Sequence, residues 1–349
     1  MRKLLYITTV NIADNSAQSL QIVSMCSAFS KLNNNFKFYC FGVSQLEHLA
    51  EYHTTSLDTG GSKLFRTIKI CFSVLKSNSK KYNVITRDLV IALVFSLLRK
   101  NVIWEAHQET SNSAKTILKF LSFFNNFKVL TISEALKQAD EIPISKNKIY
   151  SYHDGCDLES KAEALHNIVF NNKTALYSGA LHKGNDIESL SPLFECFPDW
   201  DFVFIGGKEA EIRAYRVRYS SFSNVKFLGR LPHADVINYQ LSADVLLFPL
   251  TKSNKLWKYT SPLKLFEYMK AGKPIVGSNI GSVCEILDES NSFVFNEKLD
   301  VVDAFNRYCL AQDEEVKGMI EKNKSLIKNR YNWSSRAKFI LEKIFNEWQ

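Results

Sequence analysis

The chain has 349 residues, 46% of them hydrophobic and 23% charged, with a formal net charge of +8. This length favours two domains, and the composition is ordinary for a globular protein. No apolar run of roughly 18 residues predicts a membrane span, and we expect neither a signal peptide nor a nucleic-acid-binding module. The seven cysteines are scattered and lack CxxC pairs, which favours reduced thiols and a cytoplasmic location.

The first half of the chain alternates between apolar runs of strand length and helical periods. A strand–helix–strand opening favours right-handed crossovers and a parallel sheet, here of roughly six or seven strands. We expect helices at 18–32 and 89–98. We expect strands at 3–9, 36–42, 82–86, 101–107, 128–133 and 149–155. Arg87 and Asp88 end one strand, and we favour an internal ion pair there over a contact with an acceptor.

Residues 62–76 carry an amphipathic helical pattern. Four apolar residues recur at helical spacing and four cations lie outside that stripe: Phe65, Ile68, Phe72 and Leu75, then Lys63, Arg66, Lys69 and Lys76. In most proteins such a stripe packs on a sheet, and it also suits the surface of an anionic membrane. We favour packing and keep peripheral membrane contact of segment 62–81 as the alternative.

The alternation restarts in the second half. We expect strands at 174–179, 200–207, 225–229, 243–249, 274–277 and 292–295. We expect helices near 187–197, 208–218, 234–241, 261–271, 301–312, 314–330 and 334–348. Two Rossmann-like, doubly wound α/β domains therefore follow one another, at 1–167 and 168–349, with the last helix, about 334–349, expected to pack back on the first. Ligands of such sheets lie at the carboxyl ends of the strands, so we expect the site in the cleft between the domains.

The stretch from 259 to 278 predicts a short helix whose start suits an anion. Ser261 is a good N-cap, Pro262 suits the first helical position, and Gly272 suits a left-handed end. Lys264 opposes the helix dipole in the first turn, which makes sense if a phosphate lies before it. A capped surface helix with a solvated Lys264 and Glu267 explains the local pattern equally well.

Five segments of the second half carry a resemblance to a known family. They are Gly179 with Lys183-Gly184, then 204–207, 225–232, 243–249 and 261–269. In order and spacing they resemble the second domain of GT-B-fold retaining glycosyltransferases, most closely glycosyltransferase family 4, of the glycosyltransferase group 1 type. In the first half, residues 17–32 resemble the family's first helix, Glu105-Ala-His107 its Glu-x-His strand end, and 153–157 its turn before the linker.

The resemblance implies a site for a nucleotide-diphosphate sugar. Lys183 and Lys264 would meet the diphosphate, and Glu267 would bind the ribose hydroxyls. Arg230 would lie near the nucleobase, and His107 would face the donor sugar from the first domain. The catalytic candidates are thus His107, Lys183 and Lys264.

Three positions depart from the family pattern. Tyr259 stands where many members have a glutamate, Ala180 where an arginine often follows the glycine, and Asn15-Ser16 where a glycine pair is common. We therefore expect a variant subgroup, with altered recognition of the sugar hydroxyls. Besides Glu267 and Arg230, the expected substrate-binding residues are Ser261, Leu263, Gly206, Tyr259, Asn15 and Ser16.

The resemblance implies transfer of a sugar from a UDP- or GDP-linked donor to a hydroxyl of a glycan or lipid-linked glycan, in bacterial surface polysaccharide synthesis. It implies retention of configuration, no metal and no other cofactor. Cationic side chains and a helix N-terminus must then stabilise the departing diphosphate. Two alternatives stay open: a nucleotide-sugar 2-epimerase of the same fold, and a non-catalytic nucleotide-binding subunit of a glycan assembly complex, for which Tyr259 is the only support.

Overall fold

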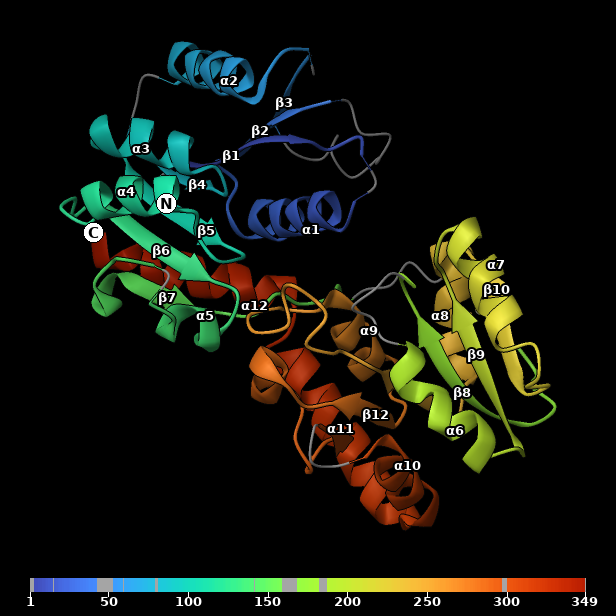
Figure 1. Ribbon diagram of the computed structural model, residues 1–349. Helices are drawn as coiled ribbons and strands as arrows, with labels where there is room; N and C mark the ends of the chain where they lie inside the picture. The colour runs from blue at the N-terminus through green and yellow to red at the C-terminus, as the bar shows by residue number, and fades with distance from the viewer. Residues whose placement is uncertain are drawn as a thin grey trace. The chain divides into compact units, whose positions relative to one another are not determined.

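The chain is described by a computed structural model that divides into two compact units. Met1–Asp154 and Asn332–Gln349 form the first unit, and Gly155–Tyr331 form the second (Figure 1). The boundary thus lies after Asp154, where the sequence predicted it after 167, and the terminal segment belongs to the first unit. The residues described are 3–14, 16–42, 53–58, 60–78, 81–140, 142–158, 168–181, 187–296 and 300–348.

Within its described residues, the first unit builds one sheet of seven parallel strands, in the order β3-β2-β1-β4-β5-β6-β7. The strands are β1 (Lys3–Asn11), β2 (Phe36–Phe41), β3 (His53–Leu57), β4 (Tyr82–Thr86), β5 (Asn101–Ala106), β6 (Phe127–Thr131) and β7 (Ile149–Ser151). Leu5 of β1 lies opposite Lys37 of β2 and Val84 of β4, so β1 is the strand from which the order runs both ways. That arrangement makes the carboxyl ends of β1 and β4 the switch point of the sheet.

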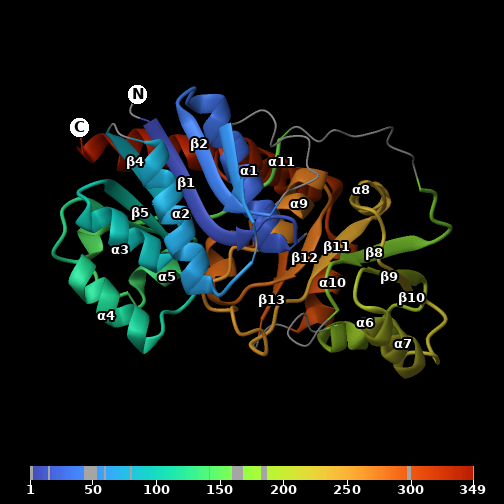
Figure 2. The same ribbon diagram turned by 90° about the horizontal axis from the view of Figure 1, so that it is seen from above.

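Helices cover both faces of this sheet (Figures 1 and 2). On one face α1 packs against α12, which comes from the terminal segment. On the other face α3 packs between α2 and α4. The helices are α1 (Ala17–Leu32), α2 (Lys63–Ser77), α3 (Leu89–Leu97), α4 (Asn112–Leu121), α5 (Glu134–Gln138) and α12 (Trp333–Lys338), which continues as a π-helical segment over Phe339–Ile344.

The favoured packing of the 62–76 stripe on the sheet is wrong. The predicted helix forms as α2, but its stripe residues point to solvent. The side that packs on the sheet carries Thr67, Ile70, Cys71 and Val74. Both sides of this helix are apolar enough to be buried, and the fold buries the one with the smaller side chains.

The second unit builds a sheet of six parallel strands across the part of it that is described, in the order β10-β9-β8-β11-β12-β13. The strands are β8 (Lys173–Ser178), β9 (Trp200–Ile205), β10 (Val225–Gly229), β11 (Val245–Phe248), β12 (Ile275–Ser278) and β13 (Phe293–Phe295). The helices are α6 (Ser191–Cys196), α7 (Glu209–Arg218), α8 (His233–Ser242), α9 (Leu263–Ala271), α10 (Val301–Leu310) and α11 (Asp313–Asn329).

Two apolar layers sandwich the second sheet. Phe194 of α6, Ile212 of α7 and Phe305 of α10 lie in one layer, and Phe266 of α9 and Ile327 of α11 in the other. With both faces covered, the strands are largely buried, as parallel sheets require, and at the edge strand β10 Lys226 and Leu228 reach solvent. The prediction of two doubly wound parallel sheets is confirmed. None of the helices that the structure describes combines the length and the apolar character needed to cross a membrane.

Candidate functional site

Three glycines close the carboxyl ends of neighbouring strands in the second unit. Gly179 follows β8, Gly206 follows β9 and Gly229 ends β10, and all three have positive φ, at 143°, 112° and 84°. The Gly179 amide donates to the Ile205 carbonyl at 2.8 Å, and the Gly206 amide donates to the Gly229 carbonyl at 2.7 Å. A Cβ at Gly206 would lie 2.1 Å from the Gly179 carbonyl oxygen. Only glycine allows this approach, so Gly206 has a structural role and its contact with substrate stays a prediction.

We call Gly179, Gly206 and Gly229 the glycine platform. Lys264 lies against Gly179 of this platform. It is the second residue of α9, and its Nζ donates to the Tyr177 hydroxyl at 2.7 Å. The same Nζ lies 3.9 Å from the centroid of the Tyr177 ring. A Cβ on Gly179 would come within 2.6 Å of Nζ, so the missing side chain of Gly179 makes room for the amine. The lysine thus brings its charge to the end of β8, beside the start of a helix.

Burial lowers the pKa of Lys264 to about 7, and Glu267 acts in the opposite direction. Near neutral pH the amine therefore exists both charged and uncharged. An anion placed against it would favour the charged form. The helix start adds the positive end of the α9 dipole to the same place.

Glu267 lies one turn further along α9, and its Oε1 is 3.3 Å from Nε2 of His233. This hydrogen bond raises the pKa of His233 above its ordinary value. The Glu267 side chain is 36% exposed and so remains accessible to a ligand. Its role with ribose hydroxyls stays a prediction. Sequence reasoning missed His233, whose only signal is its place directly after the 225–232 motif.

A buried polar cluster stabilises the end of β8, next to Gly179. The Tyr268 hydroxyl accepts from the Ser178 amide at 2.8 Å, and Gln240 Nε2 donates to Ser178 Oγ at 3.0 Å. The Tyr177 hydroxyl in turn donates to the Ala180 carbonyl at 2.7 Å. These bonds connect the end of β8 to α8 and α9, so the residues under Lys264 are fixed by three elements. In the sequence both tyrosines resemble ordinary core residues.

The start of α9 differs from its prediction. The N-cap is Pro262 and the first helical residue is Leu263, so the expectation that Ser261 caps the helix is wrong. The Leu265 amide bonds to the Pro262 carbonyl at 3.0 Å, which begins the helix one residue later, and Ser261 is only 5% exposed. The apolar face and the left-handed Gly272, with φ 66°, are confirmed.

The remaining predicted residues are spread over both units. In the second unit Arg230 is exposed at the end of β10, and Tyr259 and Leu263 are half-buried. In the first unit the Ser16 hydroxyl caps α1 by accepting from the Ser19 amide at 3.2 Å. Three other predicted residues lie outside the described part of the chain: Lys183, Gly184 and Asn15. None of these roles toward substrate is tested, and they stay predictions.

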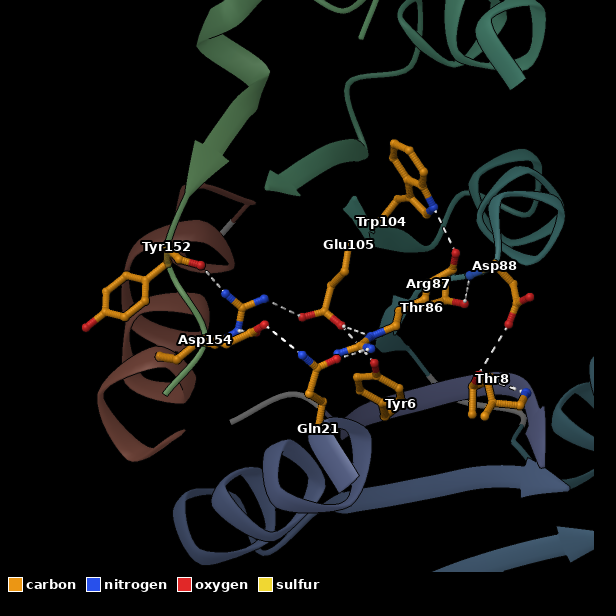
Figure 3. A network of polar contacts seen from close by, with 12 residues as sticks. Tyr6, Thr8, Gln21, Thr86, Arg87, Asp88, Trp104, Glu105, Tyr152 and Asp154 are labelled. Carbon is orange, nitrogen blue, oxygen red and sulfur yellow. Dashed lines mark hydrogen bonds and ion pairs between the residues drawn. The ribbon is translucent and has the colours of Figure 1, made fainter. Parts of the chain in front are cut away.

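The first unit holds a buried ionic network at the end of β5 (Figure 3). The Glu105 carboxylate accepts from the Tyr6 hydroxyl at 2.7 Å, lies 3.4 Å from Nε of Arg87 and pairs with Nη2 of Arg336 at 2.9 Å. Arg336 is fully buried and also donates to the Tyr152 carbonyl. Burial alone would raise the pKa of Glu105, but Arg336 and Arg87 hold it at about 2.

His107 follows Glu105 on the same strand end. Burial, together with the charges of Arg87 and Arg336, holds the pKa of His107 well below its ordinary value, so the ring is neutral at physiological pH. Its Nε2 is buried and has no hydrogen-bond partner among the described residues. An unpaired buried nitrogen of this kind suits a ligand hydroxyl. The role of His107 toward a donor sugar stays a prediction.

The ion pair expected between Arg87 and Asp88 is wrong, because both residues have other partners. Arg87 turns to Glu105, whereas Asp88 accepts from the amide and hydroxyl of Thr9, at 2.8 and 2.7 Å (Figure 3). Consecutive residues at a strand end point to opposite sides, which separates the two charges. Asp88 therefore stabilises the end of β1 by accepting hydrogen bonds from Thr9, and Arg87 belongs to the ionic network around Glu105.

A pocket of about 300 Å³ lies further along the carboxyl edge of the second sheet. Thr251 and Asn296 line it from the segments that follow β11 and β13, and Ser278 lines it from the last position of β12. Across the described parts of the chain, no three His, Cys, Asp or Glu side chains are grouped as a metal site would need.

Comparison with known proteins finds a family and two relatives that each match part of the chain. Residues 172–311 match the family described as Glycosyl transferases group 1. Over 89 residues, or 26% of this chain, the sequence is 30% identical to TuaH of Bacillus subtilis, a putative teichuronic acid biosynthesis glycosyltransferase. Over 115 residues, or 32% of this chain, it is 27% identical to a GDP-mannose-dependent phosphatidylinositol monomannoside mannosyltransferase of Corynebacterium glutamicum. These matches span only 22% and 30% of the two relatives.

Solved structures resemble the whole chain. HepE of Anabaena, solved in complex with UDP, superposes with a TM-score of 0.74 at 14% identity, over 99% of this chain and 100% of that one. A glycosyltransferase of Rickettsia africae superposes with a TM-score of 0.76 at 14% identity, over 99% of each chain. At such low identity the likeness establishes the fold alone.

The two doubly wound sheets and these structural neighbours define a protein of the GT-B fold. Within that fold, the stretch 172–311 that matches the group 1 glycosyl transferase family contains the glycine platform and Lys264.

Proposed function

We propose that the protein is a glycosyltransferase whose second unit binds a nucleotide-diphosphate sugar. The observation that carries the proposal is the placement of Lys264. Its amine lies on Gly179 at the carboxyl end of β8 and belongs to the first turn of α9. A half-buried cation at a helix start, in the stretch that matches the group 1 family, suits a diphosphate better than a structural role, because its partner there is a neutral tyrosine hydroxyl.

The proposed chemistry is departure of a nucleoside diphosphate as the sugar moves to an acceptor hydroxyl. Negative charge grows on the leaving group, and Lys264 with the α9 dipole would stabilise it, helped by Lys183. This charge stabilisation would let the reaction proceed without a metal. A front-face displacement, in which a leaving phosphate oxygen takes the acceptor's proton, would retain the anomeric configuration. Glu267 would hold the ribose hydroxyls and Arg230 would lie by the nucleobase.

The donor is proposed to be UDP- or GDP-linked and the acceptor a glycan or lipid-linked glycan. HepE has been solved with UDP and with UDP-glucose, and the mannosyltransferase relative depends on GDP-mannose. The names of the two sequence relatives refer to a surface polysaccharide and to a glycolipid. We therefore propose a role in bacterial surface glycan synthesis on the cytoplasmic side of a membrane.

The test is transfer of labelled sugar from UDP-glucose or GDP-mannose, first to water as slow donor hydrolysis and then to glycolipid extracts. Lys264→Ala is expected to lower turnover at least 100-fold and to weaken donor binding. Lys317→Ala, which removes an exposed lysine from α11, is the matched control and should change neither. Full activity of Lys264→Ala would refute the proposal.

The same assay separates the alternatives. An epimerase would return a nucleotide sugar of changed configuration without an acceptor. A non-catalytic subunit would bind nucleotide and release no product.

A further inference from the structure

Helix α2 exposes a continuous apolar stripe, which we call the α2 stripe. Its members are between 43% and 68% exposed: Leu64, Phe65, Ile68, Phe72 and Leu75. At about 100° per residue, these five positions fall within an arc of about 100° on the helix surface. Single exposed apolar residues are ordinary, but five on one arc of one helix form a patch that calls for a partner.

The charges of α2 indicate what kind of partner the stripe fits. The helix carries four cations and no Asp or Glu, in the sequence KLFRTIKICFSVLKS. Lys69 and Lys76 border the stripe on one side, and Lys63 stands at its N-terminal end, 77% exposed. Arg66 instead turns inward and donates to the Thr9 carbonyl at 3.2 Å. Three lysines therefore border the apolar patch, two along one side and one at its end.

Two of these lysines have acidic neighbours near the upper limit of ion-pair distance. Lys63 is 3.7 Å from Asp88 and Lys69 is 3.8 Å from Asp58. Lys63 is itself exposed although Asp88 is buried, and Asp58 is fully exposed, so solvent weakens both pairs and the lysines can exchange them for other anions.

The two neighbouring helices extend the same surface. Because α3 packs against both α2 and α4, the three helices form one layer over the sheet (Figure 2). Five more apolar side chains are exposed on α3, on α4 and directly after them, among them Phe123 at 83%: Val90, Leu97, Leu98, Phe120 and Phe123. Lys119 of α4 is exposed among them. The apolar and basic character thus continues beyond α2.

We infer that the α2 stripe docks this protein on the surface of an anionic lipid bilayer. Its aromatic and aliphatic side chains would enter the headgroup boundary while Lys63, Lys69 and Lys76 meet lipid phosphates. A second copy of the chain would bring the same cations face to face, which like charges oppose. The inference deepens the proposed function by locating the contact that would bring the enzyme to a lipid-linked acceptor.

The experiment is sedimentation of the full chain with vesicles. Phosphatidylcholine vesicles are compared with phosphatidylcholine vesicles that contain phosphatidylglycerol. Three lysines near the surface predict binding on the order of 100-fold tighter to the anionic vesicles, and the difference should shrink in high salt. Equal binding to both kinds of vesicle, or no binding at all, would overturn the inference.

A matched pair of double variants tests whether the α2 stripe is the surface that contacts the vesicles. Phe65→Ser with Phe72→Ser is expected to lower binding to anionic vesicles at least tenfold. Val217→Ser with Leu310→Ser removes apolar residues that are 76% and 80% exposed in the second unit, and it should leave vesicle binding unchanged. Equal binding by both double variants would place the membrane contact elsewhere and overturn the assignment.

Two further measurements, of dimer formation and of UDP-glucose binding, keep the outcomes distinct. If the wild type forms dimers that the α2 variant does not form, and neither protein binds vesicles, the stripe is a self-association surface and the inference is wrong. Binding of UDP-glucose should be the same in both double variants, because α2 belongs to the first unit. If the wild type itself does not bind UDP-glucose, the proposed function is refuted, and the vesicle result is unaffected.

Discussion

Exchange of Lys264 for arginine should remove a pH dependence of donor binding that the wild type shows. Burial lowers the pKa of this lysine to about 7, so the free protein loses the charge as the pH rises through neutrality. The diphosphate of UDP-glucose stays fully ionised there and needs the charged amine. Arginine remains charged at every pH in this range and also reaches the diphosphate.

The size of the effect follows from the fraction of charged amine. With a pKa near 7, about nine tenths of the amine is protonated at pH 6 and about one tenth at pH 8. The affinity for UDP-glucose should therefore fall about tenfold from pH 6 to pH 8, or about 1.4 kcal/mol. Because binding restores the charge, nearly one proton should be taken up per donor bound at pH 8.

The same shift has a consequence for stability. Folding lowers this pKa from 10.5, so the charged amine is disfavoured in the folded state. The free protein should gain stability as the pH rises from about 7 toward 10.5. Below that window Lys264 is charged in both states, so its full cost remains and its contribution does not change with pH.

Calorimetry in buffers of different ionisation enthalpy measures the affinity and the proton uptake together. UDP-glucose is the right probe because the terminal phosphate of UDP itself titrates near neutral pH. A wild-type affinity that is constant from pH 6 to pH 8 would show that the Lys264 amine does not meet the diphosphate, as would the same slope in Lys264→Arg.

Three further predictions concern the supporting structure. Arg336→Met should cost about 3 kcal/mol of unfolding free energy in urea, because it removes a partner of the buried Glu105 carboxylate, and a loss below about 1 kcal/mol would contradict this. The depressed pKa of Glu105 contributes stability above about pH 4.5, and this stability is lost as the pH falls toward 2. Glu105→Gln should therefore make the free energy of unfolding less dependent on pH in the acid range. An unchanged pH dependence would count against the network. Gly206→Ala should weaken UDP-glucose binding and lower the melting temperature, because its Cβ would lie 2.1 Å from the Gly179 carbonyl oxygen, whereas Gly318→Ala, with open space around it, should do neither.

The parts of the fold that the sequence predicted are those with strong periodicity. The buried strands read as continuous apolar runs, and α9 reads as an apolar face that ends at Gly272. The polar edge strand β3 and the short helix α4 were not predicted. His53–Leu57 has no apolar run, whereas Asn112–Leu121 was missed although Ser111 caps it by accepting from the Ala114 amide. Local pattern also placed the start of α9 one residue early, since Ser261 is the better cap by type but is buried by the fold.

The site was only partly predictable for a different reason. Lys264 and Glu267 lie on one helix at a recognisable spacing. Arg336 reaches Glu105 from 231 residues away, and no local pattern reports such a contact. The α2 stripe shows the same limit, because its periodicity identified an amphipathic helix but did not fix which side the sheet would bury.

A crystal structure with UDP-glucose bound would show whether the start of α9 and Lys264 hold the diphosphate. We predict that the diphosphate lies at the start of α9, within hydrogen-bond distance of Nζ of Lys264, which would exchange its bond to Tyr177 for one to a phosphate oxygen. A nucleotide bound instead in the pocket lined by Thr251 and Ser278, with Lys264 still held by Tyr177, would contradict the account.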